Sequence, residues 1–444
     1  MERLDVPAGK SRAHRWGLLA VCVAVVAGAV FRLAWVEDME YKGDEQWTFE
    51  RVCRVGVSEP FPWLGPPSGA GIRHSGGIVW VFLGLGKLFP VHEPTDLARA
   101  VQVMNVVALL LLLLFAFRWV SPGEREPWLW AAALVAVNPL AVLLQRKIWN
   151  PSITPCFSVL MLMGWWRRDR HLGAFAWGLG GVVLGYLHPA GLFLTAGFAL
   201  WAFLFDRKGT RWLSWLAGCA LAALPLLPWL QYLAFGEKPA VAHHSWDYVL
   251  TGRFWMRWVT EPLGYSLQYT LTRSAFADFL SGPVIAGHHT WLVGLLHLVL
   301  TAAGLAVLVL GGRRLWWRRA EWRQILVGRE SRTAFTLSAA LWGFGILFTL
   351  TCLPIHRHYL VLVFPLTFVW AARMALGGQG TAPADLARGR VCLLVLCVAQ
   401  ALISASFLGY VHANPRYLGE YGTPYAAQMR QPNHVAVSSA GEAR

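Results

Sequence analysis

The chain has 444 residues, of which 56% are hydrophobic and only 14% are charged, and its formal net charge is +15. A mean hydropathy of +0.46 excludes an ordinary water-soluble globular protein. In a soluble protein this positive charge would suggest nucleic acid as a partner. Here the basic residues stand in short loops between apolar segments, where the positive-inside rule places them. The composition therefore predicts an all-α polytopic membrane protein with no nucleic-acid partner.

Eleven apolar segments are candidate membrane spans, because an α-helix needs roughly 20 apolar residues to cross a bilayer. In chain order they are 16–36, 97–120, 128–144, 152–166, 172–187, 191–205, 212–234, 291–310, 333–353, 359–376 and 391–410. The first follows three basic residues but lacks a small-residue cleavage site, so we expect an uncleaved helix rather than a signal peptide.

A twelfth apolar segment, 76–89, is short for a span and contains Lys87. If it does not cross the membrane, the dense basic run at 313–332 lies inside, together with most other basic loops. If it does cross, these loops lie outside, against the positive-inside rule. We therefore expect 76–89 to lie on the outer interface or to dip into it, and 313–332 to contact anionic lipids of the inner leaflet.

This topology has an inside N-terminus and an outside C-terminus. It places two long loops on the outer side, at 37–96 and 236–290, where we expect juxtamembrane helices. The tail at 411–444 also lies outside, and its polar last part, 431–444, is expected to be disordered.

The first outer loop contains two adjacent carboxylates, Asp44 and Glu45. Gly43 breaks the preceding structure, and 45–51 can form a helix that begins at Asp44. One interpretation is that Asp44 is only the N-cap, accepting a hydrogen bond from the backbone N–H of Trp47. The functional interpretation is a general base at the membrane surface, which takes a proton from an acceptor hydroxyl or amine.

Two other turns on the outer side contain cationic residues, although the positive-inside rule places most basic residues on the inner side. Arg146 and Lys147 follow the third span, and His356 and Arg357 stand with Tyr359 before the tenth. Such groups are suited to an anionic partner such as a lipid phosphate. For the first pair the alternative is snorkelling to lipid headgroups.

Histidines elsewhere are weaker candidates. His188 ends the fifth span on the same outer side and could join the phosphate-binding group, although a structural role is also open. Paired histidines at 243–244 and 288–289 bracket the second outer loop, but no acidic residue stands near them at a metal-ligand spacing. The seven cysteines show no CxxC spacing and suggest packing. A divalent metal is possible but not favoured, and no cofactor is certain.

Together these features resemble the GT-C membrane glycosyltransferases. The features are an N-terminal span, an outer loop with Asp44-Glu45, an outer turn with Arg146, and a late His-Arg-x-Tyr motif ending at Tyr359. The nearest likeness is to bacterial Rgt-type and protein O-mannosyltransferase-like members, which include aminoarabinose transferases of lipid A. The resemblance covers 1–375, which it marks as the catalytic membrane module. A final transmembrane helix with its preceding inner loop (376–410) and the tail follow.

The resemblance implies a polyprenyl-phosphate sugar as donor and a site on the periplasmic or exterior face of the bacterial inner membrane. It implies that Asp44 is the base, with Glu45 beside it, and that Arg146, Arg357 and Tyr359 lie near the donor phosphate. The acceptor is a lipid, a glycan or a protein. One base without a second nucleophile favours a single inverting displacement.

One departure from the family concerns the turn after the third span. Many relatives have an acidic residue a few positions after the arginine, whereas here Lys147 intervenes and Asn150 stands near the expected position. The missing carboxylate weakens the case for a metal. The main alternative function is a transporter or lipid flippase, which would instead concentrate ionisable residues near the middle of the bilayer. A scaffold protein would not need these polar clusters.

Overall fold

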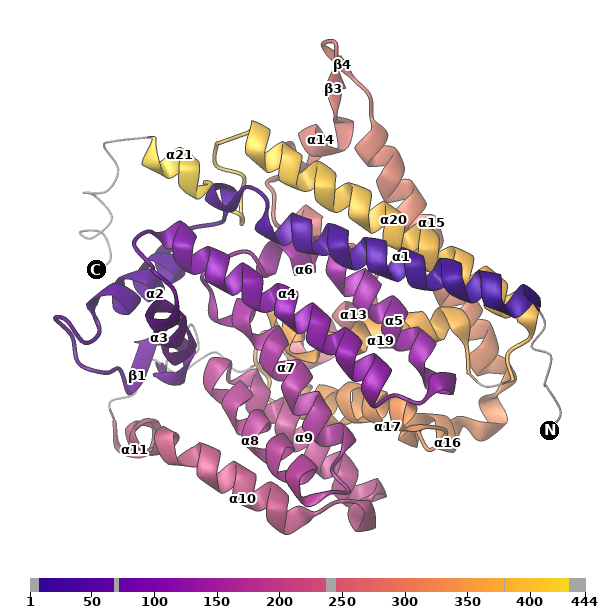
Figure 1. Cartoon of the computed structure of the whole chain (residues 1–444), viewed down its shortest axis with the longest axis horizontal. Helices are drawn as coiled ribbons and strands as arrows, with labels where there is room; N and C mark the ends of the chain where they lie inside the picture. Colours follow the sequence, from indigo (N-terminus) through magenta and orange to yellow (C-terminus); the bar gives the residue numbers. More distant parts are fainter. Residues whose placement is uncertain (1–7, 68–71, 237–244, 379, 431–444) are drawn as a thin grey trace.

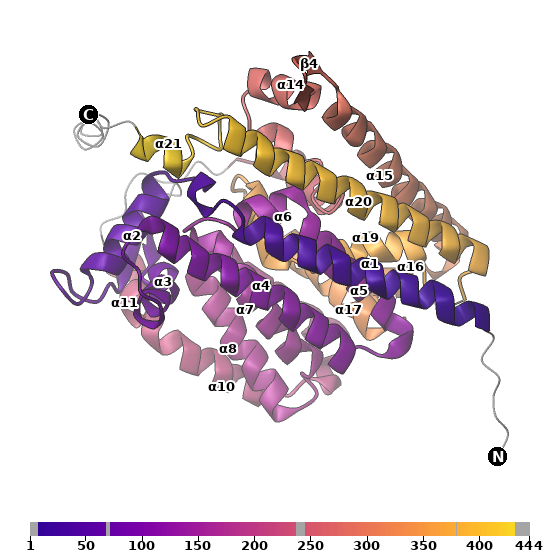
Figure 2. The ribbon, with the colours of Figure 1, turned by 45° about the horizontal axis from the view of Figure 1, so that its top comes forward.

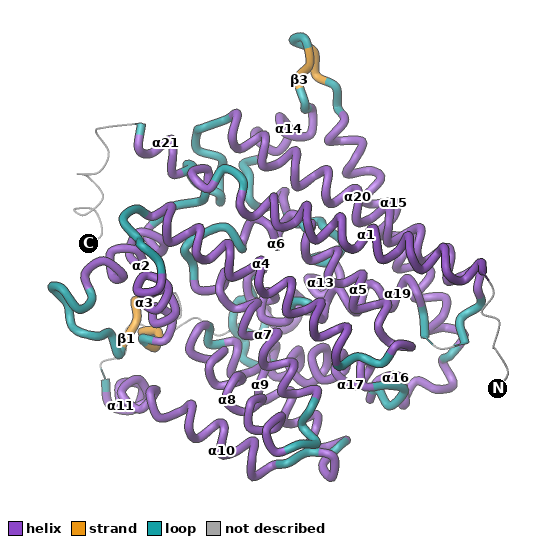
Figure 3. Tube along the Cα trace, in the orientation of Figure 1, coloured by secondary structure: helices purple, strands orange, loops and turns teal. Residues whose placement is uncertain are grey.

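The computed structural model describes residues 8–67, 72–236, 245–378 and 380–430. Helices make up 75% of the structure, as Figure 3 shows. In the first half the α-helices are α1 (Ala8–Leu33), α2 (Gly43–Arg54), α3 (Gly77–Leu88), α4 (Pro94–Arg118), α5 (Pro122–Val137), α6 (Pro139–Leu144), α7 (Asn150–Trp166), α8 (His171–Leu187), α9 (Ala190–Phe205), α10 (Trp212–Ala223) and α11 (Leu227–Phe235).

The second half has short helices in its outer loop and two long ones, α15 and α20, after it. The α-helices are α12 (Asp247–Leu250), α13 (Arg253–Thr260), α14 (Arg273–Ser281), α15 (Leu292–Trp317), α16 (Trp322–Val327), α17 (Arg332–Ser338), α18 (Gly345–Thr349), α19 (Leu366–Leu376), α20 (Pro383–Ala413) and α21 (Tyr425–Met429). A π-helix (Ala339–Phe344) joins α17 to α18, and a 3₁₀-helix, η7 (Arg357–Val363), precedes α19. Two small antiparallel hairpins are formed by β1 (Leu64–Pro67) with β2 (Arg73–Ser75) and by β3 (Val284–Ile285) with β4 (His288–His289).

Each of the twelve apolar segments is largely helical, which confirms the all-α prediction. Within the described residues, four helical stretches are both long and apolar enough to cross a membrane: α4, Trp212–Phe235, α15 and α20. The bent pair η7 and α19 makes a fifth if it counts as one span. The chain is therefore a multi-pass membrane protein, while the expected number of eleven spans is not established by these helices.

Two expected spans are interrupted. The segment 128–144 is not one helix, because Pro139 has no N–H to continue α5 and Asn138 instead caps α6 by accepting a hydrogen bond from Ala141 N at 3.0 Å. The segment 359–376 bends by 76° between η7 and α19. Both interruptions leave irregular backbone beside the outer loops, where polar side chains gather.

The long helices α1, α4 and α20 lie side by side in Figures 1 and 2. Glycine permits the close contact of α1 with α5, because a Cβ on Gly28 would lie 2.4 Å from the Ala136 carbonyl oxygen. The main core extends from these helices through α5, α7 and the π-helix, and it includes the fully buried Trp128, Trp165 and Phe344. This packing provides a rigid body on which the outer loops are held.

The tail folds back onto both outer loops. Tyr421 N donates to Thr270 O at 2.8 Å, and Tyr425 N donates to Met39 O at 3.0 Å. The described part of the tail is thus ordered as far as residue 430. The stretch 431–444, for which disorder is expected, lies outside the described residues, as does the histidine pair at 243–244.

Candidate functional site

The two carboxylates of the Asp44-Glu45 motif have different environments. The helix α2 begins one residue earlier than expected, with Lys42 as its N-cap, and Glu45 Oε2 accepts from Lys42 N at 3.1 Å. Of the two interpretations of Asp44, the one in which it is only the N-cap is therefore wrong, since Lys42 is the N-cap and Glu45 accepts from its backbone N–H. Asp44 is exposed, and its Oδ2 accepts from Trp149 Nε1 at 3.3 Å.

Glu45 is also part of a buried ion cluster. Lys147 Nζ lies 2.8 Å from Glu40 Oε2 and 3.2 Å from Glu45 Oε1, and the side chains of all three residues are less than 10% exposed. Burial alone would lower the pKa of Lys147, but the two carboxylates raise it above its ordinary value. Burial raises the pKa of Glu45, and Lys147 opposes that rise. Lys147 is thus engaged by protein carboxylates and stays cationic.

Arg146 does not line the pocket that contains Asp44. Its guanidinium donates to Phe31 O at 2.6 Å, Ala34 O at 2.7 Å and Trp35 O at 2.8 Å, at the C-terminal end of α1. These carbonyls have no partner within the helix, so the arginine acts as a C-terminal cap. With 3% of the residue exposed, the guanidinium is not presented to a phosphate, which argues against the expected contact.

Arg257, His356 and Arg357 form a cationic group in the lining of the same pocket. Arg357 Nη1 is 2.9 Å from Glu261 Oε1, and its guanidinium lies 3.6 Å from the centre of the Tyr269 ring. Arg257 donates to the carbonyl of Ile355. Burial and the neighbouring Arg357 lower the pKa of Arg257 to about 10. Two guanidinium groups are thus held close enough to repel each other, an arrangement that an anion would relieve.

Two observations show that the polar groups of this cationic group are not all paired within the protein. The Nε atom of Arg257 is buried and has no hydrogen-bond partner among the described residues. His356 is exposed, and burial of part of its ring together with Arg257 and Arg253 lowers its pKa. An anionic ligand therefore finds an available N–H donor on Arg257, although Glu261 already pairs with Arg357.

His188 and Tyr359 lie behind the pocket rather than in its lining. The His188 ring centre is 4.6 Å from that of Tyr359 and 5.8 Å from that of His358. The His358 ring is in turn 4.6 Å from that of Trp149, which does line the pocket. Burial lowers the pKa of His188 to about 3, so it is neutral at physiological pH. Its expected contact with a phosphate is replaced here by packing against aromatic rings.

The pocket itself has a volume of about 590 Å³. It is lined by Glu40, Lys42, Gly43, Asp44, Glu45, Leu140, Leu143, Leu144, Lys147, Trp149, Arg257, Tyr269, Thr270, His356, Arg357, His358, Glu420 and Tyr421. Both outer loops, the two outer turns and the tail contribute to it. Asp44 and Glu45 thus share one pocket with Lys147, His356 and Arg357, whereas Arg146, His188 and Tyr359 are outside its lining.

Several lining residues were not expected. Arg257, Tyr269 and Glu420 come from the second outer loop and the tail, where single polar residues between aromatic ones carry no motif. The one available signal was the density of Trp, Tyr and Arg in the second outer loop. Among the described residues, no group of three or more His, Cys, Asp or Glu side chains has an arrangement that could hold a metal ion.

No family model and no curated protein matches the chain. Among solved structures, it is similar to the oligosaccharyltransferase of Archaeoglobus fulgidus in the apo form, with a TM-score of 0.46 and 15% identity over 88% of this chain and 56% of that one. The enzyme AglB from the same organism, in complex with an inhibitory peptide and a dolichol-phosphate, gives a TM-score of 0.43 and 14% identity over 91% of this chain and 56% of that one.

The chain spans little more than half the length of those proteins, at 56%. TM-scores below 0.5 describe a distant likeness, so their activity is not transferred to this chain.

Proposed function

We propose that this chain is a glycosyltransferase that moves a sugar from a polyprenyl-phosphate donor to a lipid, glycan or protein acceptor. The observation that supports the proposal is that one pocket is lined both by an exposed carboxylate and by a cationic group. The carboxylate is Asp44, and the cationic group consists of Arg257, His356 and Arg357. Transfer from a sugar phosphate needs these two functions on opposite sides of the anomeric carbon.

The proposed reaction is a single displacement with inversion. The acceptor oxygen or nitrogen attacks the anomeric carbon while its proton passes to the Asp44 carboxylate. The bond between the anomeric carbon and the phosphate oxygen breaks, and the electron pair leaves with the polyprenyl phosphate. Arg357 and Arg257 stabilise the negative charge that develops on that phosphate, since charge-assisted hydrogen bonds from arginine are strong and can be bidentate.

Asp44 is preferred as the base over its two acidic neighbours. Glu40 and Glu45 are both paired with Lys147 and nearly fully buried, whereas Asp44 is exposed and has no cationic partner among the described residues. Glu420 also lines the pocket and is the alternative base. Lys147 then serves to hold Glu40 and Glu45 in place rather than to bind the donor phosphate.

The test is transfer by the purified full chain, with a panel of polyprenyl-phosphate hexoses and pentoses as donors. Asp44→Asn keeps the size of the side chain but removes the base, so transfer should fall by about 10²- to 10⁴-fold. Glu50→Gln is the matched control, because Glu50 lies on the same helix α2 but outside the pocket. It should leave transfer unchanged.

Other outcomes would redirect the assignment. Near-normal transfer by a well-folded Asp44→Asn variant, with loss in Glu420→Gln instead, would move the base to the tail. Movement of the lipid across vesicle membranes, with no sugar transferred from any donor, would favour the transporter or flippase.

We further propose the eleven-span topology with the site on the outer, periplasmic face of a bacterial inner membrane, and 1–375 as its catalytic module. The supports are the charge distribution and the motif resemblance. In a background with all seven cysteines replaced by serine, Ser121→Cys should react only with reagents that reach the cytoplasm. Val57→Cys, at a position that is 85% exposed in the first outer loop, should react from outside. The reverse pattern would contradict both the topology and the outer-face site.

A further inference from the structure

A second cavity of about 730 Å³ lies at the other end of α20 from the candidate functional site. It is lined by Asp385 in the first turn of α20, whereas Glu420 of the first pocket follows the last turn. The 31 residues of α20 correspond to roughly 46 Å at about 1.5 Å per residue. That length is close to a bilayer with its headgroup regions, roughly 40–45 Å. The second cavity therefore lies at the opposite membrane surface.

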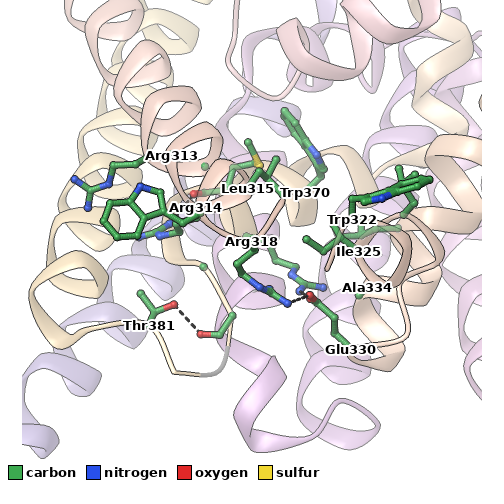
Figure 4. A pocket seen from close by; sticks show the side chains of 18 of the residues that line it. Arg313, Arg314, Leu315, Arg318, Trp322, Ile325, Glu330, Ala334, Trp370 and Thr381 are labelled. Atoms are coloured by element: carbon green, nitrogen blue, oxygen red, sulfur yellow. Dashed lines mark hydrogen bonds and ion pairs between the residues drawn. The ribbon is translucent and has the colours of Figure 1, made fainter. Parts of the chain in front are cut away.

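The cavity is cationic. Five arginines line it against two carboxylates, Glu330 and Asp385. Figure 4 shows Arg313, Arg314 and Arg318 around the opening, with Arg318 turned toward Glu330. Glu330 is shared with Arg373, and Asp385 pairs with Arg313 at 3.1 Å. The carboxylates thus neutralise only part of the positive charge.

Among the five arginines of the cavity, Arg319 has the fewest contacts with groups that offset its positive charge. Its guanidinium lies 5.0 Å from the centre of the Trp316 ring and donates to the Trp316 carbonyl at 3.2 Å. Among the described residues it contacts no carboxylate. A guanidinium that is exposed, held against Trp316 at the end of α15 and without an acidic partner is available to an anion.

The rest of the lining is apolar and aromatic. Trp317 is 77% exposed, Trp322 53% and Leu315 45%, although all three line the cavity or its rim. Behind them Leu337 and Leu341 continue the apolar surface into the helix bundle. Exposed tryptophans at a membrane surface, next to arginines, are typical of the headgroup region. A free inorganic anion would leave this apolar surface in water.

We propose that the second cavity binds an anionic phospholipid of the surrounding bilayer. The phosphate lies among Arg318, Arg319 and Arg313, and the acyl chains lie along the apolar surface of Trp322 and Leu341. Charge complementarity and the apolar surface together select a lipid that carries a negative headgroup over a zwitterionic one. This site is separate from the proposed donor site and does not depend on the enzyme's activity.

The test is native mass spectrometry of the full chain in detergent, titrated with phosphatidylglycerol or with phosphatidylcholine. Phosphatidylglycerol should be retained in a stoichiometric complex at concentrations where phosphatidylcholine is not. Arg319→Gln should weaken its binding by about tenfold, the effect of one charge-assisted hydrogen bond. Arg323→Gln is the matched control, because Arg323 is exposed over Trp322 but does not line the cavity.

Several results would overturn the proposal. They are equal retention of the two lipids, equal losses in Arg319→Gln and Arg323→Gln, or displacement of phosphatidylglycerol by inorganic phosphate. Displacement by a polyprenyl phosphate, at concentrations that leave other anionic lipids bound, would make the cavity a second site for the donor lipid. If Arg319→Gln changes the melting temperature, Arg313→Gln serves instead, because that side chain is 50% exposed.

Discussion

Glu45 Oε1 lies 3.2 Å from Lys147 Nζ, although the two residues come from different outer segments. The pair joins the start of α2 to the turn between α6 and α7, and Glu40 completes it at 2.8 Å from the same ammonium group. The consequence is a division of roles within the Asp44-Glu45 motif. Glu45 holds the first turn of α2 through Lys42 N and Lys147, and the exposed Asp44 carboxylate beside it lines the pocket.

This arrangement predicts that Lys147→Met destabilises the protein strongly. The change leaves Glu45 buried without a cation, while Glu40 keeps only its pair with Lys42, whose side chain is 41% exposed. Breaking a buried ion pair in this way costs about 3–5 kcal/mol. Thermal melting in detergent should show a clear decrease. Transfer by the remaining folded protein should also fall, because Asp44 loses its fixed support.

Lys42→Met is the control for this prediction. Lys42 Nζ contacts the same Glu40 at 2.7 Å, but its side chain is 41% exposed. Solvent screens an exposed ion pair, so the expected change in stability is only about 0–1 kcal/mol. Equal effects of the two substitutions would show that the buried cluster has no special importance.

The sequence predicted the helical framework well, because apolar length is a local property. Each apolar segment from 16–36 to 391–410 became largely helical. The charge distribution also led us to expect Asp44 and Arg357 on the same side of the membrane. In the structure both residues line one pocket. The breaks at Pro139 and before α19 were missed, because the flanking apolar residues outweigh one proline when hydropathy is averaged over a window.

The role of Arg146 was missed for a different reason. A cation at an apolar boundary is suited equally to a lipid phosphate and to the free carbonyls of a helix end, and only tertiary structure decides between them. The partner of Arg357 could not be foreseen either. Glu261 stands 96 residues away in the sequence, in a loop whose course no local pattern specifies.

The buried His188 predicts a loss of stability in acid. Burial, with His74 and His356 nearby, lowers its pKa to about 3. Below the ordinary value of about 6.5 the unfolded chain takes up a proton that the folded chain does not. The stability is fully present above about pH 6.5 and falls toward pH 3 by at most about 1.4 kcal/mol per pH unit.

His188→Gln should remove this dependence. Between pH 7.5 and pH 5, the wild-type protein should lose up to about 2 kcal/mol more than the variant, as measured by chemical or thermal unfolding. His171→Gln is the control, because His171 is exposed and bonded only to Ser214 at 2.8 Å among the described residues. It should keep the wild-type dependence. An unchanged slope in His188→Gln would mean that His188 is protonated in the folded state.

Arg357 and Arg146, which the motif resemblance placed together near the donor phosphate, are expected to have different functions. Arg357→Lys keeps the charge and can still pair with Glu261, but it loses the planar group that lies over Tyr269 and can contact a phosphate through two N–H donors. Binding of polyprenyl phosphate to the purified chain should weaken by about 1–3 kcal/mol, with little change in melting temperature.

Arg146→Lys should behave in the opposite way. A single ammonium group cannot reproduce the guanidinium's contacts with three carbonyls at the end of α1, so the melting temperature should fall while lipid affinity is retained. Weaker lipid binding in Arg146→Lys alone would return that arginine to the donor site and contradict the pocket described here.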